Sequence, residues 1–104
     1  MSDGPTLLIF DFPARPPGGP DQAAALRALA QDIAAEPDLD WKIWTESAAD
    51  RRAGGIYLFR SRAAAEAYHA KHAARLAKAG ITAIEATYRS YDAPLTAITR
   101  GPVG

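Results

Sequence analysis

Alternating and continuous runs of apolar residues divide the chain into segments typical of strands. Residues 6–12 (TLLIFDF) are apolar with β-branched and aromatic side chains, and Pro13 ends the run, which predicts a first strand. Apolar and polar side chains alternate over residues 40–47, which predicts a second. Residues 53–59 have a similar composition and follow after a short polar connector. We therefore expect the second and third strands to pair antiparallel.

Two predicted helices lie between these strands. One covers residues 23–35, where Pro20 suits the first helical turn. The other covers residues 64–78, with Ser61 as its N-cap and Gly80 as a left-handed C-terminal cap. The first helix carries one apolar stripe, formed by Leu26, Leu29, Ala30 and Ile33. A fourth strand is predicted over residues 81–91, followed by a single turn around Leu95 and Ile98.

The predicted order, β-α-β-β-α-β, is that of a ferredoxin-like α+β sandwich. We expect one domain over residues 1–104, with a Pro/Gly-rich loop at 13–20 and a C-terminal tail at 92–104. Residues 7–10 and 56–59 are apolar at every position, which indicates a sheet buried on both faces. Two helices cover only one face. We therefore expect a homodimer in which two sheets pack face to face.

The composition narrows the classes of function. The chain of 104 residues has 12 Lys+Arg against 12 Asp+Glu, so it lacks the cationic field of a nucleic-acid or membrane-surface protein. It has no cysteine and two histidines, which leaves little material for a metal site. No run is long and apolar enough for a signal peptide or a membrane span. We expect a cytoplasmic protein without bound metal.

One block of the sequence carries a family resemblance. Residues 41–47 (WKIWTES), the double glycine in 53–59 (AGGIYLF), and Lys71-His72 at matching spacing resemble the YdhR-type monooxygenases. These are small bacterial proteins of the dimeric α+β barrel superfamily, and the resemblance continues to residues 92–95. It implies a homodimer that oxygenates aromatic or quinol-like compounds without metal, flavin or another cofactor.

Such chemistry needs an apolar pocket, a base or hydrogen-bond partner for the substrate, and donors to its oxyanion. His72 and Tyr68 lie one turn apart on the second predicted helix, so both should face the sheet. We take His72 as base or hydrogen-bond acceptor, and Tyr57 and Tyr68 as oxyanion donors. The pocket walls and substrate contacts are expected from Trp41, Trp44, Glu46 and Phe59.

The strand period also assigns faces to the hairpin. If Trp44 opposes Tyr57, these two share a face with Lys42, Glu46 and Phe59. Trp41, Ile43, Ile56 and Leu58 then share the other face. The double glycine at 54–55 indicates either a bulge or a close approach to the backbone.

Structural alternatives exist for each candidate. His72 and the two tyrosines also suit a packed core with satisfied polar groups, and the tryptophans also suit core or dimer contacts. Glu46 is either a half-buried acid with a raised pKa or a strand-end charge paired with Lys42 or Arg89. The basic residues of the second helix, Lys71, Arg75 and Lys78, are interpreted as a solvated helix face.

Two other functions remain open at this point. The same pocket would allow a non-catalytic protein that binds a small apolar or aromatic molecule. An isomerase or a haem-handling protein would also be consistent with the superfamily that the chain resembles.

Overall fold

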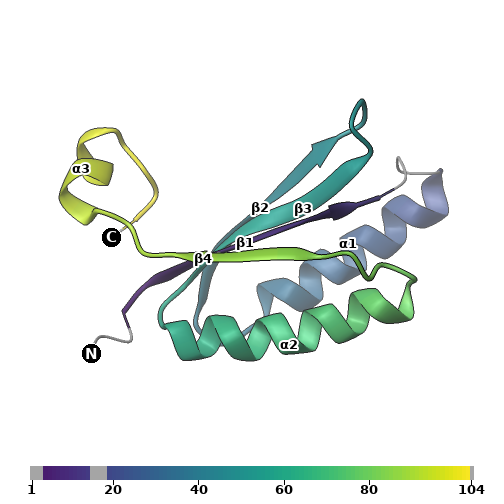
Figure 1. Cartoon of the computed structure of the whole chain (residues 1–104), viewed down its shortest axis with the longest axis horizontal. Coiled ribbons are helices and arrows are strands. Elements are labelled where there is room, and N and C mark those ends of the chain that lie inside the picture. The colour runs from purple at the N-terminus through teal and green to yellow at the C-terminus, as the bar shows by residue number, and fades with distance from the viewer. Residues whose placement is uncertain (1–3, 15–18, 104) are drawn as a thin grey trace.

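A computed structural model of the chain describes residues 4–14 and 19–103. Within them, four antiparallel strands form one sheet in the order β2-β3-β1-β4. Helices α1 and α2 both lie on the same face of this sheet, and α3 lies beyond one end of it (Figure 1). The elements are β1 (Thr6–Pro13), α1 (Pro20–Ala34), β2 (Leu39–Ser47), β3 (Arg52–Phe59), α2 (Arg62–Lys78), β4 (Glu85–Arg89) and α3 (Ala93–Ile98). The β-α-β-β-α-β order confirms the predicted ferredoxin-like fold.

Local sequence signals account for the helix ends. Pro20 occupies the first turn of α1, and the Ser61 hydroxyl accepts the backbone N–H of Ala64 at 3.0 Å to cap α2. Gly80 ends α2 with φ +86°, the left-handed conformation expected there. Asp92 caps α3 in the tail by accepting the backbone N–H of Leu95. Of the predicted loop at 13–20, Pro13 belongs to β1 and Pro20 to α1, while residues 15–18 lie outside the described part of the chain.

The fourth strand is shorter than predicted. It covers Glu85–Arg89 rather than residues 81–91. The backbone N–H of Ile81 instead bonds the Leu76 carbonyl at 2.9 Å, so this part of the chain completes the cap of α2. Ile81 and Ile84 pack against the core from outside the sheet, which explains why their apolar character imitates a strand.

The register of the central hairpin differs from the predicted one by two residues. Lys42 opposes Tyr57, and Trp44 opposes Gly55. A shift of two keeps every side chain on its face of the sheet, so the predicted assignment of faces is confirmed. The β1–β3 register runs through the double glycine without a bulge. A side chain at Gly54 would overlap the Phe10 carbonyl, so close backbone approach explains this glycine.

The core lies between the sheet and the two long helices and is mainly aromatic. Phe10, Tyr57 and Phe59 from the sheet pack with Tyr68 from α2, and each is at most 2% exposed. The Tyr57 and Tyr68 rings are 4.9 Å apart, and the Phe59 and Tyr68 rings 5.3 Å. No helix in the described residues is sufficiently long and apolar to span a membrane.

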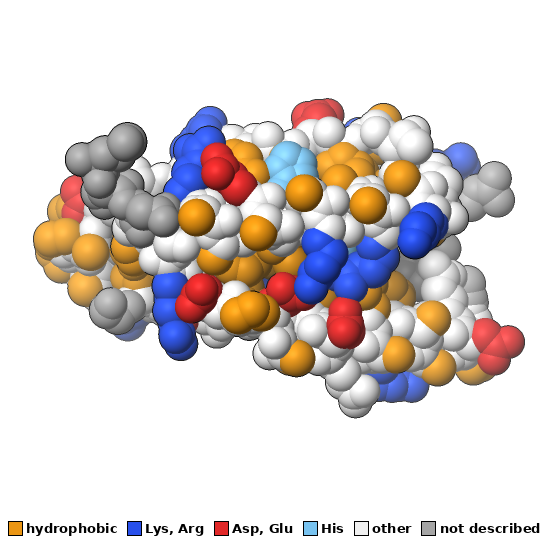
Figure 2. Space-filling view, turned by 90° about the horizontal axis from the view of Figure 1, so that it is seen from below, with side chains coloured by type: hydrophobic (Ala, Val, Ile, Leu, Met, Phe, Trp, Pro, Cys, Tyr) orange, Lys and Arg blue, Asp and Glu red, His pale blue; other side chains and the backbone are white. Residues whose placement is uncertain are grey.

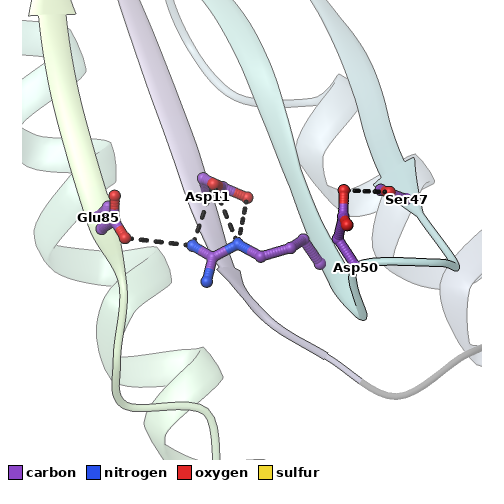
Figure 3. Close-up of polar contacts among 5 residues, drawn as sticks. Asp11, Ser47, Asp50 and Glu85 are labelled. Atoms are coloured by element: carbon purple, nitrogen blue, oxygen red, sulfur yellow. Dashed lines mark hydrogen bonds and ion pairs between the residues drawn. The ribbon is translucent and has the colours of Figure 1, made fainter.

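The outer face of the sheet, away from the helices, has an apolar part and a charged part. Leu7 and Ile9 are only partly buried there, and Ile43 is 50% exposed. Toward the hairpin turn, Arg52 of β3 contacts Asp11 of β1 at 3.0 Å and Glu85 of β4 at 3.3 Å, so one guanidinium links three strands (Figure 3). Figure 3 also shows Ser47 bonded to Asp50 within the turn. The predicted apolar outer face is therefore limited to one end of the sheet.

Candidate active site

A cavity of about 310 Å³ opens between α1 and the β2–β3 side of the sheet. Ile33 is the one residue of α1 that is fully buried, while Leu29 is half-buried and Leu26 is 38% exposed. The apolar stripe predicted for this helix thus faces a cavity over part of its length instead of a filled core. The residues that surround the cavity and carry its chemistry are Lys42, Trp44, Glu46, Tyr57 and His72.

Strand β2 supplies three of these side chains by its alternation. Lys42, Trp44 and Glu46 point to the helix side, where α2 brings His72 over the sheet. Phe12, Leu26 and Leu76 make much of the remaining wall apolar. An apolar cavity of this size with a few convergent polar groups is typical of small-molecule sites.

Lys42 is held against two aromatic rings inside the cavity. Its Nζ lies 3.3 Å from the centroid of the Trp44 ring and 4.8 Å from that of Tyr57. Gly55 leaves room for it, because a Cβ there would lie 2.5 Å from Lys42 Cε. Burial, and secondarily the positive charge of Arg75, lower the pKa of Lys42 from 10.5 to about 7.

His72 is buried and is bonded by a cation. Arg75, one turn along α2, donates from Nε to Nδ1 of His72 at 3.1 Å, and its Nη2 is 2.9 Å from the same nitrogen. The imidazole also stacks on Tyr68, with ring centroids 5.1 Å apart. Burial, followed by the charges of Arg75 and Lys42, lowers the pKa of His72 to about 4.

The Arg75 contact also decides which nitrogen of His72 carries the hydrogen. A guanidinium has donors only, so Nδ1 must present its lone pair to it. The neutral ring then has its hydrogen on Nε2. Near neutral pH His72 is therefore a hydrogen-bond donor through Nε2, and its one free lone pair is already used.

Tyr57 and Tyr68 form a hydrogen-bonded pair. The Tyr68 hydroxyl donates to the Tyr57 oxygen at 3.2 Å. Burial raises the pKa of both phenols, which keeps them neutral. Tyr57 borders the cavity, whereas Tyr68 lies behind it and contacts both Tyr57 and His72.

Two ion pairs tie α2 to the segment containing α1. Arg75 contacts the Asp32 carboxylate at 2.6 Å, and Lys71 pairs with Glu36 just after α1. Acidic and basic side chains lie side by side on the helix face of the molecule (Figure 2). The basic residues of α2 are therefore not simply a solvated face, because Arg75 turns toward Asp32 and His72.

The structure brings some of the predicted site residues together and separates others. His72, Tyr57, Trp44 and Glu46 border the cavity. Phe59 and Tyr68 are core residues behind it. Trp41 is on the opposite face of the sheet, where its Nε1 donates to the Pro102 carbonyl at 2.7 Å, so it does not border this cavity.

Glu46 differs from both of its expected roles. It is exposed at the cavity mouth rather than half-buried. None of the ion pairs within residues 4–14 and 19–103 joins it to Lys42 or Arg89.

The sequence did not predict a chemical role for two residues of the site, Lys42 and Arg75. The signal for Lys42 was a single lysine on the inward face of a strand. The signal for Arg75 was weaker and consisted of its spacing of three residues from His72. His69, by contrast, bonds Tyr88 through Nδ1 at 2.6 Å. Within the described residues no three His, Cys, Asp or Glu side chains gather as metal ligands.

The fold and the cavity define a ferredoxin-like α+β protein with a ligand-sized space between its sheet and its first helix. The family described as "Putative mono-oxygenase ydhR" matches residues 7–102, and the chain belongs to this family. Comparison with curated proteins finds no match.

Proposed function

We propose that the protein is a cofactor-independent monooxygenase that acts on a small aromatic or quinol-like compound in this cavity. The observation that carries the proposal is the cavity itself, which is apolar and bordered by Trp44, Tyr57, Lys42 and His72. The family to which the chain belongs supports the reaction class.

The proposed chemistry makes the organic substrate the electron donor. An enolate or phenolate formed in the cavity reacts with dioxygen to give a hydroperoxide. For an activated CH₂ group, loss of water then leaves a carbonyl, so one oxygen atom enters the product and the other leaves as water. The protein has to exclude water and hold the oxyanion, for which the apolar walls and neutral hydrogen-bond donors are suited.

His72 has a different part in this proposal from the base expected from the sequence. A ring with a pKa of about 4 and its lone pair bonded to Arg75 is poorly suited to accept a proton. Its Nε2–H instead serves as a donor to the oxyanion. Tyr57, kept neutral by burial, is the second donor from the same wall.

Oxygen uptake with a panel of hydroquinones and anthrones tests the function. We expect substrate-dependent consumption that is reduced about a hundredfold or more in His72→Ala, the usual scale for losing an oxyanion donor. His69→Ala is the matched control, because His69 is on the same helix but does not border the cavity. No consumption by the wild-type protein at any pH near neutrality would exclude the oxygenase function.

A non-catalytic binding protein is the second candidate, and the largely apolar wall favours it equally. It predicts saturable binding of aromatic compounds without oxygen uptake. Haem handling through His72 is less well supported, since Arg75 already occupies the Nδ1 lone pair. A Soret shift on adding haem that disappears in His72→Ala would favour haem binding instead.

We also propose that the protein is a homodimer joined through the outer face of its sheet. The partly buried Leu7 and Ile9 and the half-exposed Ile43 support an interface at the apolar end of this face. Both long helices lie on the other side of the sheet, so they do not cover these residues (Figure 1).

A further inference from the structure

The cavity contains few groups able to take a proton from a substrate. Tyr57 is a neutral phenol, and the basic nitrogen of His72 is bonded to Arg75. Arg51 and Arg52 also border the cavity, but arginine does not lose its proton in proteins, and the Arg52 guanidinium is paired on the outer face of the sheet. Lys42 and Glu46 remain, and of these Lys42 is the less exposed.

The position of Lys42 suits an amine that reacts with a bound molecule. Its nitrogen lies over the Trp44 and Tyr57 rings, and Gly55 leaves the space that its chain occupies. None of the ion pairs within the described residues engages it. An aromatic ligand stacked in the cavity would therefore meet a lysine whose hydrogen-bonding capacity is not used by a carboxylate.

Burial and the Arg75 cation favour the neutral form of Lys42, whereas its contact with the Trp44 and Tyr57 rings favours the ammonium. Helix α2 contributes the Arg75 cation and the uncharged His72, and β3 contributes the uncharged Tyr57. On β2, Glu46 is two residues along the same face and exposed. Helix α1 borders the cavity with the uncharged residues Gln22, Leu26 and Leu29, while its Asp32 is paired with Arg75. Burial and the Arg75 charge thus lower the pKa of Lys42 to about 7, where neutral amine and ammonium coexist near neutral pH.

We propose that Lys42 accepts the proton of a weakly acidic hydroxyl group, a phenol or an enol, and that the cavity binds the resulting oxyanion between the Lys42 ammonium and the Nε2–H of His72. The proton moves from the ligand oxygen to Nζ, so a neutral pair becomes an ion pair and no other reactant is needed. This inference rests on the cavity being the substrate site, as in the proposed function. It identifies the substrate class as compounds with an ionisable hydroxyl on a planar conjugated system.

A chromogenic phenol, 4-nitrophenol, tests this directly, because its phenolate absorbs visible light and its neutral form does not. We expect the wild-type protein to bind it as the phenolate at a pH where the free compound is mostly neutral. The apparent pKa of the bound phenol should fall by about one unit, which corresponds to roughly tenfold tighter binding of the anion.

Lys42→Met should bind the phenol at least about tenfold more weakly at that pH and without the phenolate absorbance. Lys78→Met is the matched control, with the same change of charge on an exposed residue of α2 that does not border the cavity. Lys42→Arg keeps the positive charge but has no neutral form, so it should also bind the phenolate and lower the apparent pKa of the bound phenol, but it should release the phenol proton to the buffer instead of taking it up. This second variant keeps the test decisive if Lys42→Met fails to fold.

The results separate this inference from the proposed function. Phenolate binding that depends on Lys42, without oxygen uptake for any substrate, would support the inference and contradict the oxygenase. Oxygen uptake that is unchanged in Lys42→Met would support the oxygenase function and contradict the role of Lys42. If the wild-type protein does not bind the phenol, or if Lys42→Met still binds it as phenolate, the inference is wrong.

Discussion

Arg75 donates a hydrogen bond from Nε to Nδ1 of His72 at 3.1 Å, and this contact determines the state of the imidazole. The ring is neutral, with its hydrogen on Nε2, because the guanidinium has no acceptor to offer. Asp32 of α1 holds the same guanidinium from the other side at 2.6 Å. A chain of three residues thus connects the outer surface of α1 to a group on the cavity wall.

Removing the guanidinium should change the titration of His72. In Arg75→Met we expect the His72 pKa to rise from about 4 toward its ordinary value of 6.5, although burial, the larger cause of the shift, keeps it below that value. Titration of the ring by NMR measures the pKa, and long-range ¹H–¹⁵N spectra report the tautomer. Lys78→Met serves as the control for charge. An unchanged pKa with Nε2 still protonated would contradict the assigned role of Arg75.

The depressed pKa of His72 also predicts an acid-sensitive fold. The unfolded chain takes up the His72 proton near pH 6.5 and the folded protein only near pH 4. Adding protons therefore favours the unfolded state. The contribution of His72 to the free energy of unfolding is complete above about pH 6.5 and is lost as the pH falls to about 4. This contribution is about 3 kcal/mol.

Urea unfolding at several pH values tests this window. We expect the free energy of unfolding to fall less between pH 6.5 and 4 in His72→Gln than in the wild-type protein, since glutamine does not titrate. His69 is present in both proteins and so does not distinguish them. Parallel profiles for the two proteins would show that His72 is not the source of the acid sensitivity.

The two adjacent glycines of β3 should respond differently to alanine. At Gly54 a methyl group would overlap the backbone carbonyl of Phe10, which the sheet holds in place. At Gly55 it would meet the far end of the Lys42 side chain, which can move. We expect Gly54→Ala to cost about 3 kcal/mol or more and Gly55→Ala about 1 kcal/mol. Urea unfolding measures both costs, and equal costs would contradict this account.

Gly55→Ala has a second expected effect, on the cavity. Displacing the Lys42 side chain toward solvent relieves the burial that lowers its pKa, so the lysine pKa should rise toward 10.5 and phenolate formation should weaken. NMR titration of the ¹⁵N- or ¹³C-labelled lysine side chain reports this shift. A lysine pKa that remains near 7 in Gly55→Ala would show that the absence of a side chain at Gly55 is not required for the position of Lys42.

The proposed dimer makes a prediction that is independent of the cavity. Ile43→Asp places a charge on the apolar part of the outer face, where Ile43 is 50% exposed. We expect a dimer mass for the wild-type protein at micromolar concentration in light scattering, and a monomer mass for the variant. Leu95→Asp is a comparison at another exposed apolar residue, in α3 outside the sheet. A monomeric wild-type protein would contradict the interface.

Much of the fold could be predicted from local signals in the sequence. Ser61, Gly80 and Pro20 act on their immediate neighbours, so the helix ends could be recognised without knowledge of the rest of the chain. The error at residues 81–84 has a physical reason as well. Ile81 and Ile84 are apolar because they pack on the core, and an apolar residue does not reveal whether it does so from a strand or from a cap.

The candidate site was predictable only in part. Alternation along β2 predicted Trp44 and Glu46 on the helix side of the sheet. The same alternation predicted Trp41 on the other side, although Trp41 was also expected to form part of the pocket wall. Period alone does not indicate which face of a sheet has an open cavity. That depends on how closely α1 approaches the sheet, which is a property of packing between elements distant in sequence.

The sequence by itself determined the order of elements, the two faces of each strand and the turn spacing of Tyr68, His72 and Arg75, because these follow from the local periods of strand and helix. Only the tertiary structure decided the chemical state of the site. Lys42 and His72 come from different elements, and their pKa values are lowered by the burial and the Arg75 charge that packing brings to them. Desolvation and charge proximity depend on distances in space, which the residue types alone do not specify.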